Sequence, residues 1–199
     1  MKKLAPIVLL LFFFAQLSAQ NISDLESFEK AMKPGTQLTY DVTNKDLHYQ
    51  LVLTIKKLGD EISFDWKTTA PDNKSGTVTM NAAATGQAEA LQNNFKGGTA
   101  ALTNETSIWI SKKVFTTIAS TAQASIKMNG ASDTVTVMAN TIGEYNFNLD
   151  GNLVAVPGWE MQGGGEPKYT IDILESTKFP ILYKVDMGWS MVLSEVKGM

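Results

Sequence analysis

The chain has 199 residues, with 20 acidic residues, 17 basic residues that are all lysine, one histidine and no cysteine. Without cysteine the chain can form no disulfide and has no cysteine nucleophile. A single histidine excludes the paired histidines of many zinc sites. The net charge of −3 and the lack of arginine, whose guanidinium fork recognises phosphates and guanine edges, argue against nucleic-acid partners.

Residues 1–19 have the pattern of a secretory signal peptide, with two lysines, an apolar run over 7–15 and a small residue, Ala19, at the end. The run is shorter than the roughly 20 residues of a membrane-spanning helix, so a retained anchor is the weaker interpretation. We therefore expect cleavage after Ala19 and export to the periplasm or the extracellular space. The mature chain, 20–199, would form a single β-rich domain without a transmembrane segment.

The mature region is predicted to begin with a short helix and to continue with strands. Ser23 is a suitable N-cap, and Pro34-Gly35 would end the helix. Hydrophobic residues then occur at every second position, which predicts half-exposed strands over 47–56 and 61–67. The inner face of the first strand would carry Leu47, Tyr49, Leu51, Leu53 and Ile55.

The middle of the chain has a weaker pattern. Residues 84–95 are rich in Ala and Gln, and they fit either a weak helix or a mobile excursion. Ser111 is predicted to cap a brief helix whose buried side would carry Val114, Phe115 and Ile118.

The C-terminal part returns to alternation. Asp150-Gly151 predicts a tight hairpin turn, while 129–133 and Gly163-Gly164-Gly165 predict further loops. Strands are predicted over 125–128, 134–138, 145–149, 153–156, 168–174, 181–187 and 189–196.

Many short strands with two or three short helices predict a mainly β protein. The favoured architecture is a single antiparallel curved sheet, a barrel or half-barrel, and the alternative is a β-sandwich. Both bury one face of every strand, but only the barrel or half-barrel also has a concave cavity.

No residue pattern indicates catalysis. His48 lies on the polar face of its strand, where a solvated side chain is the expected role. Ser27 and Lys30 match an S-x-x-K motif on the first helix, but its partner motifs are absent. The carboxylates are scattered as on a solvated surface, and no acid–base pair stands out. We predict no catalytic residue, no metal site and no cofactor.

Aromatic residues are the candidate ligand-binding residues, because they could line an apolar cavity or simply fill the core. The candidates are Trp66, Tyr145, Trp159 and Trp189. Trp159 follows Pro157-Gly158 and precedes the glycine loop, so its ring is expected to be the most exposed.

Two segments resemble a known group of proteins. The order Pro34-Gly35-x-x-Leu38-x-Tyr40-x-Val42, and Phe179-Pro180-Ile181-Leu182 before a strand containing Leu193, are similar to the TapB-like exported proteins of Bacteroidota. The resemblance covers 34–196 loosely. It implies an open, lipoprotein-carrier-like half-barrel and assigns no functional residue.

Three functions remain open. The first is a non-catalytic cell-envelope protein that holds a lipid, another apolar ligand or a partner segment on the concave face of its sheet. It predicts a continuous apolar cavity that opens near Trp159 or Trp66. The second is a structural or interaction protein with a filled core that contacts other envelope proteins. The third, a hydrolase, would need Asp or Glu residues clustered in a pocket.

Overall fold

The computed structural model describes residues 22–71, 73–129, 134–164 and 169–198. The expected signal peptide, most of the predicted loop over 129–133 and the end of the predicted glycine loop lie outside the described residues.

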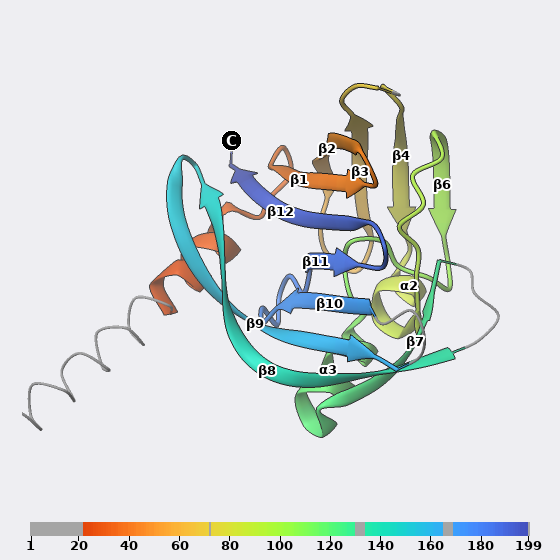
Figure 1. Ribbon diagram of the computed structural model, residues 1–199, viewed down its shortest axis with the longest axis vertical. Coiled ribbons are helices and arrows are strands. Elements are labelled where there is room, and N and C mark those ends of the chain that lie inside the picture. Colours follow the sequence, from red (N-terminus) through yellow and green to blue (C-terminus); the bar gives the residue numbers. More distant parts are fainter. Residues whose placement is uncertain (1–21, 72, 130–133, 165–168, 199) are drawn as a thin grey trace, which may run out of the picture.

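Twelve strands form one sheet, in the order β5-β7-β8-β9-β10-β11-β12-β1-β2-β3-β4-β6 (Figure 1). The strands are β1 (Gln37–Asn44), β2 (Leu47–Lys57), β3 (Ile62–Thr68), β4 (Ser75–Met80), β5 (Ala90–Leu91), β6 (Gly98–Leu102), β7 (Gln123–Met128), β8 (Thr134–Leu149), β9 (Asn152–Gly163), β10 (Tyr169–Leu174), β11 (Leu182–Asp186) and β12 (Ser190–Lys197). The helices are α2 (Ala82–Gln87), α3 (Lys112–Thr121) and an N-terminal helix over 22–31. The predicted single, mainly β sheet with short helices is therefore confirmed.

The sheet curls into a partial ring. β8 is 16 residues long and pairs with β9 along most of its length. Its C-terminal end also pairs in parallel with β12, where Asn148 stands opposite Glu195. The sheet is mixed rather than purely antiparallel, because the outermost pair at each end, β5–β7 and β4–β6, is parallel. The predicted turn between β8 and β9 is present, with φ of 51° at Asp150 and 83° at Gly151.

Alternation correctly predicts which face of β2 and β3 is buried. Leu51, Leu53 and Ile55 of β2 are at most 2% exposed, and Phe64 of β3 is fully buried. The prediction that Leu47 is buried is wrong, because its side chain is 50% exposed. Leu47 stands at the first position of β2, where the strand extends beyond the core to the open rim of the sheet.

The N-cap predicted from the sequence is correct for α3 but wrong for the N-terminal helix. The Ser111 hydroxyl accepts a hydrogen bond from the backbone N–H of Val114 at 3.2 Å, which confirms the predicted start of α3. A helix over 84–95 is not observed, because α2 starts after its cap Asn81 and the chain turns extended at Ala88. Ser23 lies inside the N-terminal helix rather than at its cap, since residue 22 is already helical.

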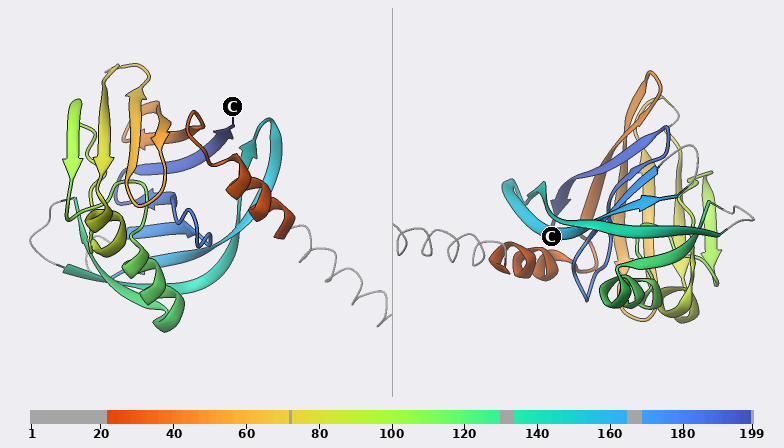
Figure 2. Two further views of the ribbon diagram at one scale, coloured as in Figure 1. Left: turned by 180° about the vertical axis from the view of Figure 1, so that it is seen from behind. Right: turned by 60° about the horizontal axis from the view of Figure 1, so that its bottom comes forward.

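The middle of the hollow is filled by the chain itself. Seen from behind, α2 and α3 lie in front of the sheet, on its concave side (Figure 2). The segment between β6 and α3 carries Trp109, which stacks on Phe64 with ring centroids 5.5 Å apart and forms a bridge to Ile181. The Tyr40 hydroxyl is buried and donates to the carbonyl oxygen of Leu182, the residue after Ile181, at 2.8 Å. Within the described residues, this packing occupies the middle of the hollow.

The N-terminal helix is fixed to the opposite half of the sheet. Phe28 is fully buried and meets Phe147 of β8 edge to face, with ring centroids 5.8 Å apart. Asp24 accepts a hydrogen bond from the backbone N–H of Ala155 at 3.0 Å. Within the described ranges, no helix is both long and apolar enough to cross a bilayer.

Candidate functional site

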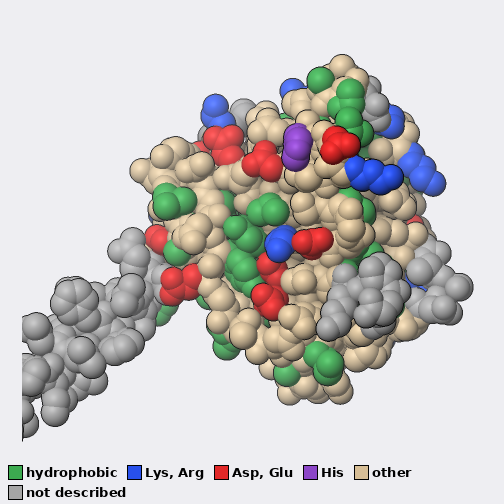
Figure 3. Space-filling model, viewed as in Figure 1, with side chains coloured by type: hydrophobic (Ala, Val, Ile, Leu, Met, Phe, Trp, Pro, Cys, Tyr) green, Lys and Arg blue, Asp and Glu red, His purple; other side chains and the backbone are tan. Residues whose placement is uncertain are grey.

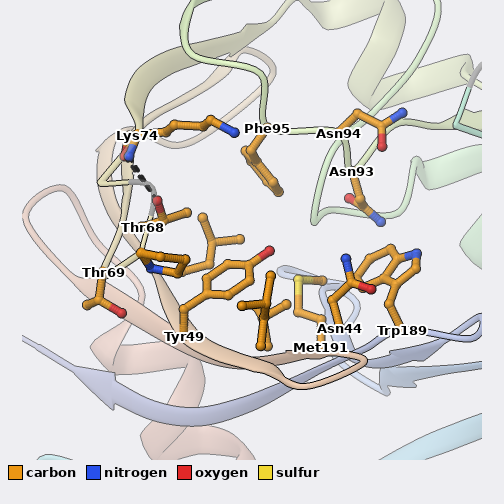
Figure 4. Close-up of a pocket in the computed structure, with 14 residues that line it drawn as sticks. Asn44, Tyr49, Thr68, Thr69, Lys74, Asn93, Asn94, Phe95, Trp189 and Met191 are labelled. Carbon is orange, nitrogen blue, oxygen red and sulfur yellow. Dashed lines mark hydrogen bonds between the residues drawn. The ribbon is translucent and has the colours of Figure 1, made fainter.

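A pocket of about 390 Å³ opens at the rim of the concave face (Figure 4). Its floor consists of side chains that stand in register across three neighbouring strands. Val42 of β1 is opposite Tyr49 of β2 on one side and opposite Met191 of β12 on the other. Strand alternation directs these side chains to the concave side, so the floor follows from the period of the sequence.

Two aromatic side chains from loops form the walls. Phe95 belongs to the loop between β5 and β6, and its ring meets Trp66 edge to face with centroids 5.1 Å apart. Trp189 lies in the turn between β11 and β12, where Gly188 has a φ of 80° and the backbone N–H of Met187 donates to the Trp189 carbonyl at 2.9 Å. Both loops are therefore anchored, Phe95 by packing and Trp189 by a closed turn.

The rim is polar and comes mainly from the end of the β3–β4 hairpin. The Thr68 hydroxyl accepts a hydrogen bond from the backbone N–H of Lys74 at 3.0 Å. The Thr69 hydroxyl accepts one from the backbone N–H of Gln50 at 2.9 Å. Asn44 lies at the opposite side of the opening. An apolar floor, aromatic walls and a polar rim are the usual composition of a small-molecule site.

Asn93 is the polar side chain inside this pocket, and it is 6% exposed. Its backbone N–H donates to Asn129 Oδ1 at 2.9 Å, and its own Oδ1 accepts from the backbone N–H of Ile108 at 3.4 Å. Its Nδ2 has no hydrogen-bond partner in the described part of the chain. Figure 4 shows the amide directed into the pocket, on the side where Phe95 and Trp189 lie.

The four aromatic candidates from the sequence do not come together. Trp189 lines the pocket, and Trp66 lies behind the Phe95 wall. Trp159 was expected to be exposed, and this is wrong: it is 8% exposed, with its ring centroid 4.9 Å from that of Phe115. Trp159 is buried by tertiary packing, because α3 covers this part of β9. Tyr145 stands elsewhere, on the face of the sheet described next.

A second group of side chains lies on the face opposite α3. Glu160 of β9, Asp172 of β10 and Lys184 of β11 stand in register, and Tyr145 stacks on Tyr183 with centroids 4.6 Å apart. Figure 3 looks onto this face and shows exposed hydrophobic side chains beside acidic side chains and a lysine near its middle.

Asp172 is a buried acidic residue of this group, and its pKa is shifted. It is 5% exposed, and its Oδ1 has no hydrogen-bond partner among the residues described. Burial raises the pKa of Asp172 to about 6, with the nearby Lys184 opposing the shift and Glu160 adding to it. Burial also raises the pKa of Tyr145 and Tyr183, and the charge of Asp172 adds to both shifts.

This acid does not belong to the pocket. The described residues that line the 390 Å³ pocket include no Asp, Glu or His. Over the same described ranges, no group of three His, Asp or Glu side chains is placed to hold a metal ion. The pocket is lined by apolar and hydrogen-bonding side chains, with one lysine, Lys74, at its rim.

Comparison of the chain with models of known families, with curated proteins and with solved structures finds no match.

Sequence reasoning missed Tyr49 as a pocket residue and missed Phe95 and Asn93 altogether. Tyr49 was predicted only to face inward. Phe95 lies in the stretch 84–95, which fits either a weak helix or a mobile excursion, and nothing in the run from Gln92 to Lys96 indicates a buried amide. The one available signal was an aromatic residue among amides just before Gly97, which is typical of a loop that positions side chains.

Proposed function

We propose that this chain is an exported, non-catalytic binding protein of the cell envelope that holds a small apolar ligand in the rim pocket. The observation that supports the proposal is the arrangement of Phe95 and Trp189 as walls over a floor formed by Val42, Tyr49 and Met191. Half-buried aromatic walls over an apolar floor leave some apolar surface in water. A ligand that covers this surface gains about 25 cal/mol per Å².

The volume limits the ligand. About 390 Å³ lies in the lower part of the range of small-molecule pockets, which is roughly 300 to 1,000 Å³. A single acyl chain or a small ring system suits it better than a lipid with two chains. Because Trp109 and its neighbours fill the middle of the hollow, the ligand would lie at the rim and not along the whole concave face.

Native mass spectrometry tests this proposal on the mature chain purified from its own host, followed by extraction of bound molecules. We expect a bound small molecule on the unmodified chain. The variant Trp189→Ala removes one wall and should lose it. Ile142→Ala is the matched control, because Ile142 is 74% exposed on β8 and does not line the pocket.

Two results would contradict the proposal. One is a clean unliganded mass that also fails to change when apolar small molecules are added. The other is a bound peptide in place of a small molecule, which would favour the interaction protein instead. A ligand that survives Trp189→Ala but not Ile142→Ala would place the site elsewhere.

A further inference from the structure

The amide of Asn93 is held in one orientation by the backbone. Ile108 has a φ of 65°, which a β-branched residue rarely adopts, and the N–H of Trp109 closes a tight turn by donating to the Ser107 carbonyl at 2.7 Å. This turn fixes the direction of the Ile108 N–H, which donates to Asn93 Oδ1. An N–H group can face only the oxygen of the amide, which assigns Oδ1 to the Ile108 side. The nitrogen is then on the other branch of the amide, which Figure 4 shows on the pocket side.

The loop that carries Asn93 is anchored on both sides. The backbone N–H of Gln92 donates to the Thr106 carbonyl at 2.8 Å, and that of Asn93 donates to Asn129 Oδ1 at 2.9 Å. Asn129 is itself fixed, because its backbone N–H donates to the Leu91 carbonyl at 2.7 Å. The amide therefore cannot easily turn away to satisfy its nitrogen elsewhere.

A buried donor without a partner is costly, and most buried polar groups in proteins have one. Asn93 Nδ2 lies among aromatic and aliphatic side chains and is directed into the open pocket. A ligand that supplies an acceptor there removes this cost, whereas a purely apolar ligand leaves the donor unpaired. The pocket thus discriminates between ligands by their polar group as well as by their shape.

We propose that the ligand carries a neutral carbonyl oxygen that accepts a hydrogen bond from Asn93 Nδ2, while its apolar body lies against Phe95 and Trp189. This inference rests on the proposed function of the pocket. A neutral carbonyl is favoured over a carboxylate because burying an anion requires a compensating charge. The Asn93 amide is buried and uncharged, whereas Lys74, the lysine among the lining residues, is exposed at the rim. Esters, amides and ketones share the required group.

Three matched probes test the inference on the mature chain by nitrogen–proton NMR titration. They are butyrophenone, which has a carbonyl, butylbenzene, which has the same shape without an acceptor, and 4-phenylbutyrate, which has a carboxylate. We expect butyrophenone to bind about tenfold more tightly than butylbenzene and more tightly than 4-phenylbutyrate. The side-chain NH₂ signals of Asn93 should shift with butyrophenone in a saturable manner.

Asn93→Leu is the matched variant, since it keeps the approximate size of the side chain and removes the donor. In this variant the two neutral probes should bind equally, with butylbenzene bound at least as well as by the unmodified chain. If the variant does not fold, the comparison of the three probes and the Asn93 signals of the unmodified chain still test whether the ligand's carbonyl binds Asn93.

The outcomes separate this inference from the proposed function. Equal binding of butyrophenone and butylbenzene by the unmodified chain would overturn the inference and leave the apolar pocket in place. Tightest binding of 4-phenylbutyrate would overturn the choice of a neutral carbonyl. Binding of none of the three would contradict both the inference and the proposed function.

Discussion

The variant Asp172→Asn should make the protein more stable at neutral pH and leave its stability almost unchanged at pH 4. The carboxyl group is 5% exposed, and burial raises its pKa to about 6 from an ordinary value of 3.8. The folded protein therefore holds this proton more tightly than the unfolded chain does. Stability then falls as the pH rises from about 4 to about 6, and it stays at the lower level above that window.

The size of the effect follows from the same values. A pKa of about 6 in the folded protein against 3.8 in the unfolded chain corresponds to at most about 3 kcal/mol. Water and nearby groups relax around a charged side chain, so we expect a gain of about 1 to 2 kcal/mol at pH 7.5. The asparagine keeps the size of the side chain and does not titrate, so packing changes little.

Urea unfolding followed by circular dichroism at pH 4, 5, 6 and 7.5 measures the difference in the free energy of unfolding. Asp186→Asn is the control, because Asp186 is an exposed residue on the neighbouring strand β11, and its replacement should change stability by less than about 0.5 kcal/mol. If the Asp172→Asn variant is less stable at pH 7.5, or if its gain in stability is the same at pH 4, then burial of the charged carboxylate does not destabilise the fold.

Two further substitutions test the packing of the fold by the same unfolding assay. Gly158→Ala should lower the free energy of unfolding by more than about 2 kcal/mol, because the added Cβ would clash with the Ile173 carbonyl oxygen and the Tyr145 ring. Gly143→Ala is the control and should cost little, because its Cβ would be 3.5 Å from the Tyr145 ring, an ordinary contact. Equal losses in the two variants would contradict this prediction. Ser111→Ala should cost about 1 to 2 kcal/mol, since its hydroxyl caps α3 and donates to Ala88; no loss of stability would show that the cap is unimportant.

Local signals in the sequence were sufficient for the elements that depend on neighbouring residues. Alternation predicts the buried faces of β2 and β3, because each side chain of a strand must point to water or to the interior. Ser111 and Asp150-Gly151 predict a helix start and a hairpin turn, since each needs only a few adjacent residues with suitable side chains or φ values.

Long-range contacts could not be predicted in this way. The parallel contact between Asn148 and Glu195 joins residues that no local pattern relates, yet it curls the sheet. Trp159 is buried because α3, which is distant in sequence, lies over β9. The pocket likewise depends on a loop residue, Asn93, that is oriented by the tight turn at Ile108. Each of these features depends on tertiary packing, which overrides local propensity.

The most direct test of a ligand pocket at the rim is a map of backbone and side-chain NMR signals during titration with butyrophenone. If the ligand binds in the rim pocket, saturable shifts should gather at Asn93, Phe95 and the Trp189 indole, with Tyr145 and Tyr183 unchanged. Shifts that gather on the Tyr145 and Tyr183 face, or shifts that never saturate, would contradict it.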